Sequence, residues 1–416
     1  MSRSCQVFSG QSWTAPDTGT VVAAALRSLV ARWCDILRSP MRVGLLASGV
    51  GVLIATARLL VAAHGHAGDF VVAGRYFANP KLVPHGVRVF PGTGYDGQFF
   101  YRIALDPADF ARRAFGVRID SSYRFQRIGY PVLGWLGSLG GHPSMVPWSL
   151  IVVNLIAVGV AGFAAAVLAS QAGRHPAWGL LMVGFFGFPF SLSRDTAEIV
   201  TAGFTLIGIV ALRGRRYVLA AAALSAAVLT RETVVLIVFA YGIVRIVAIV
   251  RRKASPGAPD LAWVVPGVAF VGWQAVVTAF SSTPAVSDLS ANLSIPFVAM
   301  VRAVSHWVAA LPATAADLWV EQAVVLIFVV IVAATGLRRS SARSYERLAF
   351  VLLAVLSVSL AYGIWGGQAD FRSFSELYVF AVLVAIEVRQ RRHLWVIAAP
   401  VALAWLPVVV HQVAFI

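Results

Sequence analysis

Charged side chains are scarce in this sequence. Asp, Glu, Lys and Arg make up only 12% of the 416 residues, whereas hydrophobic residues make up 59%. A soluble protein of this length carries about a quarter charged residues. The composition therefore excludes an ordinary soluble globular protein. The mean hydropathy of +0.79 is typical of a polytopic membrane protein instead.

Cysteine and the common cofactor-binding motifs are also nearly absent. The two cysteines, Cys5 and Cys34, both precede the first long apolar run, so no disulfide framework is expected. The sequence contains no glycine-rich phosphate loop, no HExxH motif and no Cys–His metal cluster. We therefore expect no cofactor. Two or three acidic residues could hold a divalent cation, but no spacing between them requires one.

Long apolar runs recur along the chain and predict an all-α, polytopic bundle of transmembrane helices. The bundle is preceded by a cytoplasmic arm over residues 1–42 and occupies residues 43–416. About eleven spans are expected, near residues 43–63, 146–171, 177–193, 196–213, 216–230, 232–250, 262–281, 318–337, 347–365, 373–389 and 394–413.

The basic residues indicate how the bundle is oriented. The net charge is +16, and the clusters "RGRR", "VRRK", "LRRS" and "RQRRH" each follow an apolar run that would end on the same side. Basic residues collect in cytoplasmic loops, which predicts a cytoplasmic N-terminus and an outer C-terminus. Two long outer loops then follow, at residues 64–145 and 282–317. No internal repeat and no separate soluble domain is evident.

The stretch "GTGYDGQFFYRIALDP" lies in the first outer loop. Tyr95, Phe99 and Ile103 recur at helical spacing, which predicts an amphipathic helix along the outer membrane surface. Asp96 would stand at the start of this helix, where the helix dipole favours a carboxylate. One alternative remains open, namely that Asp96 only caps the helix.

Three further charged stretches are expected at the same outer face. Charges at this depth are costly and usually face a cavity or a partner. For the stretch that contains Arg194 and Glu198, the alternative is a solvated ion pair between these two residues, which would be of little energetic value. The stretches are "FPFSLSRDTAEIV" with Arg194, Asp195 and Glu198, "LTRETV" with Arg231 and Glu232, and "WGGQADFRSFSELY" with Gln368, Asp370, Arg372 and Glu376.

These residue types on one face are suited to glycosyl transfer from a lipid-phosphate donor. Arginines bind phosphate through paired, charge-assisted hydrogen bonds, and a carboxylate can take the proton of an acceptor hydroxyl. Asp96 is a candidate for this base, and Asp195 is its main challenger by local charge. The expected substrate-binding residues are Tyr95, Gln98, Arg102, Arg127, Arg194, Glu198, Arg231, Glu232, Asp370 and Arg372.

Four stretches in this order resemble a known family. They are "YDGQFFYRIA", "RFQRIGYPVLGWL", "FPFSLSRDTAEIVTAGF" and "AALSAAVLTRETVVL". Over residues 43–240 the chain resembles the polytopic GT-C glycosyltransferases that use lipid-phosphate sugars, in particular the phosphatidylinositol-glycan mannosyltransferase V type and its bacterial relatives. Looser matches are Tyr130–Pro131, Ala197–Glu198, Thr230–Arg231 and Phe371–Arg372.

The resemblance implies a role for Asp96 and a class of substrate. Tyr95–Asp96–Gly97 stands where the family has a tryptophan–aspartate–alanine stretch, so the base role comes to Asp96 by resemblance. Related enzymes often place their acid early in this loop, which makes Asp69 the second candidate for the base, ahead of Asp195. Because Tyr95 and Gly97 depart from the family's stretch, the resemblance by itself does not carry the family's sugar preference over to this chain. The implied fold is a helical membrane bundle, and the implied donors are polyprenyl- or dolichyl-phosphate sugars.

The resulting hypothesis is a glycosyltransferase in a bacterial plasma membrane, with its active site facing outward. It would move a sugar, with mannose favoured, from a polyprenyl-phosphate donor to a lipid or glycan acceptor. Membrane lipids are the other expected partners, and nucleic acid is not expected. Two alternatives remain, a polytopic transporter or lipid flippase and a non-catalytic partner that shares the fold.

Overall fold

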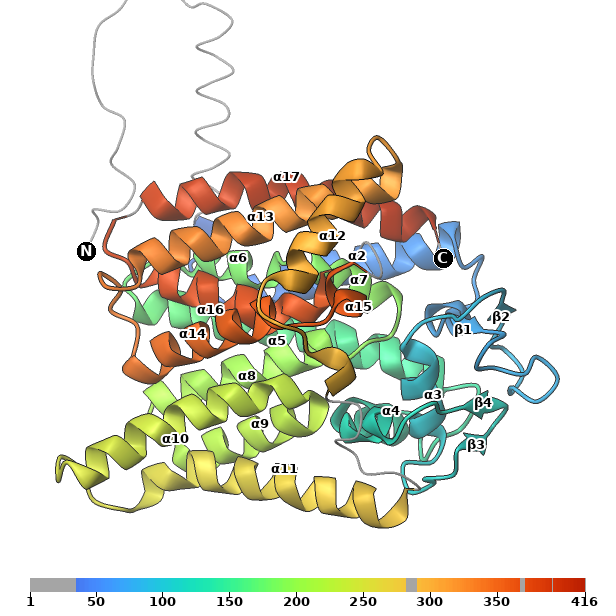
Figure 1. Ribbon diagram of the computed structural model, residues 1–416, viewed down its shortest axis with the longest axis horizontal. Helices are drawn as coiled ribbons and strands as arrows, with labels where there is room; N and C mark the ends of the chain where they lie inside the picture. Colours follow the sequence, from blue (N-terminus) through green and yellow to red (C-terminus); the bar gives the residue numbers. More distant parts are fainter. Residues whose placement is uncertain (1–34, 282–289, 367–370, 391, 416) are drawn as a thin grey trace, which may run out of the picture.

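The computed structural model describes residues 35–281, 290–366, 371–390 and 392–415. These residues form a bundle of helices, most of which run side by side (Figure 1). The described strands are two residues long and lie in the first outer loop: β1 (Ala73–Gly74), β2 (Val89–Phe90), β3 (Arg113–Ala114) and β4 (Val117–Arg118). The all-α, polytopic fold predicted from the apolar runs is confirmed.

Among the residues that the structure describes, six helical segments are long and apolar enough to cross a membrane, which makes the chain a multi-pass membrane protein. They are α2 (Pro40–Val61), α5 (Val146–Gln171), α10 (Val235–Val250), α11 (Leu261–Phe280), α13 (Thr314–Gly336) and α17 (Arg392–Ala414).

Shorter helices complete the bundle. Two of them, α6 and α7, form one candidate span that is bent by 63° at its break, which raises the number of candidate spans to seven. Each of the eleven predicted segments contains a helix, but the number of spans stays a prediction. The shorter helices are α6 (Leu180–Val183), α7 (Gly187–Ser193), α8 (Glu198–Arg213), α9 (Tyr217–Thr230), α14 (Ser344–Val358), α15 (Tyr362–Trp365) and α16 (Ser375–Ile386).

Small residues bring the first two long helices together. A Cβ atom added to Gly44 on α2 would lie only 2.7 Å from the carbonyl oxygen of Gly159 on α5. One added to Gly162 would lie 2.8 Å from the Cβ of Ala47. Helices within a membrane associate through such close packing, because lipid supplies no hydrophobic driving force between them.

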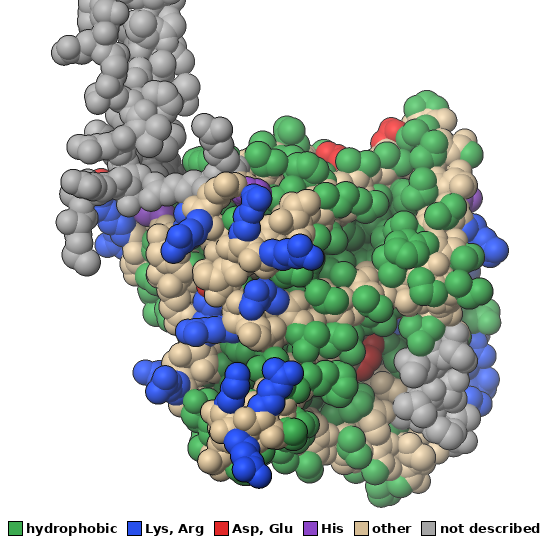
Figure 2. Space-filling view, turned by 60° about the vertical axis from the view of Figure 1, so that its left-hand side comes forward, with side chains coloured by type: hydrophobic (Ala, Val, Ile, Leu, Met, Phe, Trp, Pro, Cys, Tyr) green, Lys and Arg blue, Asp and Glu red, His purple; other side chains and the backbone are tan. Residues whose placement is uncertain are grey.

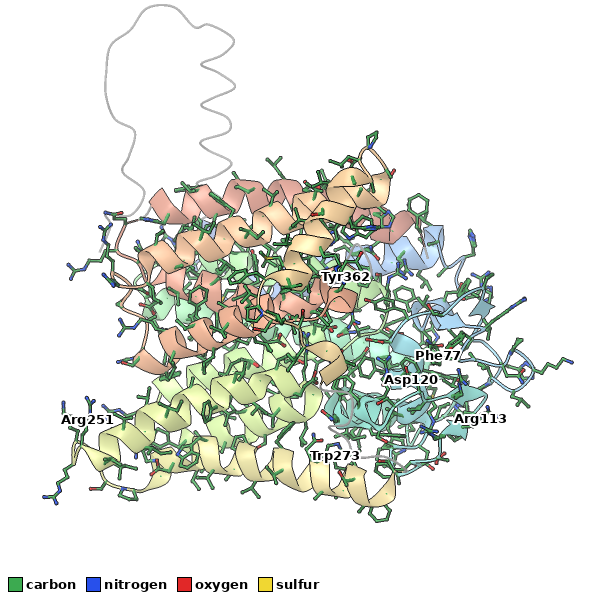
Figure 3. The ribbon with its side chains drawn as sticks, viewed as in Figure 1. Phe77, Arg113, Asp120, Arg251, Trp273 and Tyr362 are labelled. Atoms are coloured by element: carbon green, nitrogen blue, oxygen red, sulfur yellow. The ribbon has the colours of Figure 1, made fainter. Side chains whose placement is uncertain are left out.

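One end of the bundle is strongly basic. Figure 2 shows Lys and Arg side chains gathered there, and Figure 3 shows Arg251 at the end opposite to Arg113. Arg213 ties this end together, because its guanidinium donates to Glu346 on α14 and to Glu387 at the end of α16, both at 2.7 Å. The basic loops thus share one end, as the charge pattern predicts. Their placement on the cytoplasmic side stays a prediction.

The opposite end carries the first outer loop, with α3 (Gly97–Leu105) and α4 (Gly129–Gly137). The predicted helix after Asp96 is confirmed, but its predicted solvated face is not found. Every residue of α3 is buried, including Arg102, which donates to the carbonyl oxygens of Asp109 at 2.7 Å and Ala111 at 2.6 Å. The loop after α3 accepts the hydrogen bonds of Arg102, so the polar side of α3 is buried against the protein and not against water. The second outer loop contributes α12 (Val298–Ala309).

Candidate active site

A cavity of about 290 Å³ opens where the first outer loop meets the segment before α16. Tyr95 and Asp96 line it from the start of α3, and Arg124 lines it from the following loop. Arg372 and Ser373 approach from the far end of the chain, next to Gly363 and Ile364 of α15. The cavity therefore lies among segments that are distant in the sequence.

The carboxylate of Asp96 is held by two arginines. It accepts a hydrogen bond from Arg124 at 2.7 Å and another from Arg372 at 2.5 Å. Asp96 occupies the residue before α3, but its side chain makes no capping hydrogen bond. The alternative that Asp96 merely caps the helix is therefore wrong. Its oxygens face the arginines and the cavity.

The surroundings of Asp96 favour its ionised form. Burial by itself would raise the pKa of the carboxyl, but the positive charges of Arg124, Arg372 and Arg127 outweigh it and hold the pKa well below its ordinary value. Hydrogen bonding from Arg372 acts in the same direction. The side chain is thus a carboxylate at any physiological pH, able to accept a proton only if its arginine partners are drawn elsewhere.

Arg372 joins three segments of the protein. Besides Asp96, it donates to the hydroxyl oxygen of Tyr95 at 2.6 Å and to Glu198 at 2.5 Å. Its guanidinium also lies over the Tyr95 ring, 4.7 Å from the ring centroid. A planar guanidinium with several donors can hold all three groups at once. Arg372 is the centre of the site.

Glu198 and Arg231 extend this network into the bundle. Glu198 is 1% exposed and also accepts from the Ser191 hydroxyl at 2.9 Å. The alternative of a solvated Arg194–Glu198 pair is therefore wrong for Glu198. Arg231 lies 4.0 Å from Glu198 and donates to Glu376 at 3.1 Å. Alternating charges lower the cost of burying them, which explains how this end of the bundle holds so many charged side chains.

A second ion pair, between Arg127 and Glu232, lies beside the pair between Asp96 and Arg372. Arg127 donates two hydrogen bonds to Glu232, at 2.9 Å and 2.7 Å, in a bidentate arrangement. The Tyr123 hydroxyl donates to the same carboxylate. Asp96, Tyr123, Arg124 and Arg127 also line one small cavity. The pair is thus continuous with the Asp96 site.

The other two predicted candidates for the base do not line this cavity. Asp69 is buried and accepts two hydrogen bonds from Arg88, which fixes the chain after α2. Asp195 is also buried and adopts a left-handed conformation with φ of 47°. Neither of its oxygens has a hydrogen-bond partner among the described residues. Burial raises the pKa of Asp195 well above its ordinary value, against the opposing charge of Arg58.

The remaining predicted residues divide between the cavity and its supports. Gln98 lines the cavity, accepts from the Gly74 amide at 3.1 Å and donates to the Thr93 carbonyl at 2.9 Å. Arg194 lies over the rings of Tyr95 and Phe190, at 5.3 Å and 4.6 Å. Arg102 supports the loop after α3 and does not reach the cavity. Gln368 and Asp370 lie outside the described residues.

Two residues join the site without having been predicted for it, Tyr123 and Arg124. The only signal in the sequence is that Arg124 precedes Arg127 by three residues in "RFQR", so that both can reach the same side of a helical turn. The structure places Tyr123 and Arg124 in the short 3-10 helix Ser122–Gln126, and Arg127 is the residue directly after this helix. Among the described residues, no three His, Cys, Asp or Glu side chains gather in a group that could hold a metal ion.

No family model matches the sequence, and no curated protein matches it. Among solved structures, the chain is similar to ArnT from Cupriavidus metallidurans bound to undecaprenyl phosphate, with a TM-score of 0.44 and 15% sequence identity. The similarity covers 84% of this chain and 61% of that chain, so the present protein spans less than two thirds of the length of ArnT. We transfer neither fold nor function from a similarity of this strength.

Proposed function

We propose that this protein is a membrane glycosyltransferase. It moves a sugar from a polyprenyl-phosphate donor to a lipid or glycan acceptor, and the resemblance seen in the sequence favours mannose. The observation that carries the proposal is the position of Asp96 between Arg124 and Arg372 at the wall of a cavity. A carboxylate flanked by two phosphate-binding side chains is what this reaction needs.

The reaction is a direct displacement at the anomeric carbon of the donor. The acceptor hydroxyl oxygen forms a bond to this carbon while the bond from the carbon to the phosphate oxygen breaks. The hydroxyl proton passes to the Asp96 carboxylate. The leaving polyprenyl phosphate keeps the electron pair, and Arg372 and Arg124 stabilise the charge that develops on it.

The low pKa of Asp96 is consistent with this role if the arginines change partners. Before the donor binds, both guanidinium groups are engaged by Asp96. A bound phosphate competes for the same donors through bidentate hydrogen bonds. As the arginines turn toward the phosphate, the carboxylate loses part of its positive surroundings and becomes a stronger base. The donor thus activates the base that serves it.

Other residues hold Arg372 in place for this exchange. Glu198 and the Tyr95 hydroxyl accept from two of its nitrogens, and the Tyr95 ring supports its plane. Glu198 is in turn fixed by Ser191. These are positioning residues, since they contact Arg372 rather than the reacting atoms. Preorganised donors of this kind avoid a reorganisation cost during the reaction.

The site is proposed to face the outer side of a bacterial plasma membrane. It lies at the end of the bundle that carries the first outer loop, opposite to the basic clusters that directly follow apolar runs (Figures 1 and 2). Basic loops remain on the cytoplasmic side during membrane insertion. A polyprenyl-phosphate sugar would reach the cavity from the lipid, which removes the need for a nucleotide-binding fold.

A transfer assay tests the proposal. Protein in lipid nanodiscs is given radiolabelled polyprenyl-phosphate mannose and a membrane lipid extract as acceptor, beside the Asp96→Asn variant. Transfer by the wild type and its loss in the variant are expected. If the variant transfers as well as the wild type, another acid is the base. If the wild type is inactive with mannose, arabinose and other polyprenyl-phosphate sugars, the protein is not this kind of enzyme.

One observation favours a transporter as the second candidate. The pair α6 and α7 is bent by 63° at its break, and broken helices line the substrate sites of many transporters. The break also lies against the charged network, because a Cβ atom added to Gly187 at the start of α7 would lie 2.8 Å from the Cα atom of Arg372. Uptake of a fluorescent lipid-linked sugar across a proteoliposome membrane, without any chemical transfer, would show that the protein is a transporter and that the glycosyltransferase proposal is wrong.

A further inference from the structure

A second cavity lies in the first outer loop, beside the one that contains Asp96. Its volume is about 780 Å³, it is open to solvent, and the β3–β4 hairpin, residues 75–80 and Leu82 line it. Three arginines line it, Arg75, Arg113 and Arg118, and no acidic residue does. Phe77 lines both this cavity and the Asp96 cavity, so the two share a wall. We call this second space the arginine cavity.

The hairpin places two of these arginines opposite each other. Arg113 on β3 pairs with Arg118 on β4 in the antiparallel register. Like charges directly opposite each other in such a pair destabilise it. Among the residues that the structure describes, no salt bridge neutralises Arg75, Arg113 or Arg118. An anion between them would remove this repulsion.

The hairpin holds one of these arginines, Arg118, in place. Arg118 lies over the rings of Tyr76 and Phe77, at 5.2 Å and 5.6 Å from their centroids. Its backbone amide donates to the Phe77 carbonyl at 2.7 Å, and the Asn79 amide donates to the Gly116 carbonyl at 2.8 Å. A side chain at Gly116 would clash with the backbone of residues 82–83. Arg118 is therefore preorganised rather than freely solvated.

Aromatic rings complete the lining. Tyr76 is 63% exposed and Phe115 is 38% exposed at the tip of the hairpin. Phe115 adopts φ of 49°, a conformation that normally favours glycine or asparagine. The chain thus accepts backbone strain to keep an aromatic ring at this position. Rings and arginines together are the chemistry that contacts a sugar carrying a negative charge.

We propose that the arginine cavity binds an anionic group, phosphate or carboxylate, on the acceptor glycan. The proposal rests on the proposed glycosyltransferase function and names its acceptor class. Because Phe77 separates the two cavities, an acceptor held by Arg113 and Arg75 can extend past this ring to place a hydroxyl beside Asp96. Figure 3 shows Phe77 nearer to the helix bundle than Arg113, as this path requires.

Binding is tested first, without any transfer. The full-length protein in nanodiscs of zwitterionic lipid is titrated with fluorescently labelled tri-galacturonate and with maltotriose as the uncharged match. We expect tri-galacturonate to bind about tenfold or more tighter, and its affinity to fall as salt is added. Inorganic phosphate competes with it. Equal affinity for the two sugars would overturn the proposal.

Matched variants place the binding in the cavity. Arg75→Gln combined with Arg113→Gln should weaken tri-galacturonate binding by about tenfold or more, since two charge-assisted contacts are lost. Arg112→Gln is the control, because Arg112 is an exposed neighbour that does not line the cavity. An equal loss in the control would show a diffuse charge effect and overturn the proposal. Both variants are checked for an unchanged melting temperature, and Arg113→Gln alone replaces the double variant if it melts early.

A transfer assay and a lipid assay separate the remaining outcomes. With an acidic acceptor, the double variant should raise KM and leave kcat unchanged, and a neutral acceptor should show no difference. Arginine-dependent binding with no transfer by the wild type would support the anion-binding site and contradict the proposed glycosyltransferase function. If the same arginines instead hold the protein to anionic vesicles and leave tri-galacturonate binding unchanged, the cavity serves the membrane surface and the proposal fails.

Discussion

Arg372 donates a hydrogen bond to Asp96 at 2.5 Å, although the two residues are separated by 276 positions in the chain. The same guanidinium reaches Glu198 and the Tyr95 hydroxyl, so one side chain connects the first outer loop, the start of α8 and the segment before α16. The candidate active site exists only when these three segments meet. Disturbing either residue should therefore disturb the proposed active site.

Asp96→Asn should abolish most of the transfer activity. The amide cannot take the acceptor proton, and loss of a general base commonly lowers the rate by about 10²- to 10⁴-fold. Initial rates of radiolabel transfer measure the effect. Asp120→Asn is the matched control, because Asp120 is exposed and pairs with the same arginine, Arg124, at 3.1 Å. Equal losses in both variants would mean that the charge of Arg124, and not the Asp96 base, limits the reaction.

Arg124→Gln should move the acidic limb of the pH–rate profile upward. Burial favours the neutral form of Asp96, and Arg124 is the largest of the charges that oppose it and keep the pKa low. Without Arg124 the pKa rises, so the carboxylate is protonated at a higher pH and kcat/KM falls earlier as the solution is acidified. The profile of kcat/KM against pH reports this group in the free enzyme.

The control for that shift is Arg112→Gln, which removes an exposed arginine from the same loop and contacts no part of the site. Its profile should overlay the wild type. An acidic limb that stays in place in Arg124→Gln would show that Asp96 is not the group that titrates.

Arg372→Lys should weaken the enzyme although it keeps the positive charge. A lysine is a point charge and cannot donate in a plane to Tyr95, Asp96 and Glu198 together. Loss of one charge-assisted hydrogen bond corresponds to about 1.5–3 kcal/mol, so kcat/KM should fall by about tenfold or more. Arg339→Lys, at the exposed basic end of the bundle, should leave kcat/KM as it is. Full activity of Arg372→Lys would show that the site needs only the positive charge of Arg372 and not its planar hydrogen bonds.

Asp195→Asn should make the stability of the protein less sensitive to pH. Burial raises the pKa of Asp195 in the folded state above its unfolded value, so the folded state binds the proton more tightly. The resulting stability is fully present below the unfolded pKa of about 4 and is lost as the pH rises through the folded pKa. Asparagine does not titrate, so the variant lacks this pH-dependent contribution to stability.

The measurement is the apparent melting temperature of both proteins in detergent across a series of pH values. The wild type should lose stability relative to Asp195→Asn as the pH rises. Parallel curves would mean that Asp195 is ionised and paired in the folded protein. Because Asp195 does not line the Asp96 cavity, transfer activity in this variant should stay close to that of the wild type.

Several features could be read from the order of residues alone, because they depend on local chemistry. The long apolar run at 146–171 predicts α5 at the same residues that the structure shows. The four basic clusters predict a shared basic end, since each directly follows an apolar run. Asp96 is marked by being a lone carboxylate in an aromatic stretch. In each case the informative residues are close together in the sequence.

One expectation and one alternative drawn from local pattern did not hold, for the same reason. The spacing of Tyr95, Phe99 and Ile103 predicts a helix with an exposed polar face, but the carbonyl oxygens of Asp109 and Ala111 satisfy Arg102 inside the protein. Residue spacing likewise suggests that Glu198 pairs with Arg194 in solvent, yet it is buried against Arg372. A pattern along one helix shows which side is polar. It does not show whether water or another part of the chain satisfies that side.

The sequence by itself therefore determined that this is a helical membrane protein with a basic end and a charged stretch around Asp96. Only the tertiary structure decided which arginines face that carboxylate, and that Asp69 and Asp195 lie outside its cavity. The physical reason is that helix formation and membrane partition depend on neighbouring residues. An ion pair depends on the distance between two side chains, and folding brings Asp96 and Arg372 together from opposite ends of the chain.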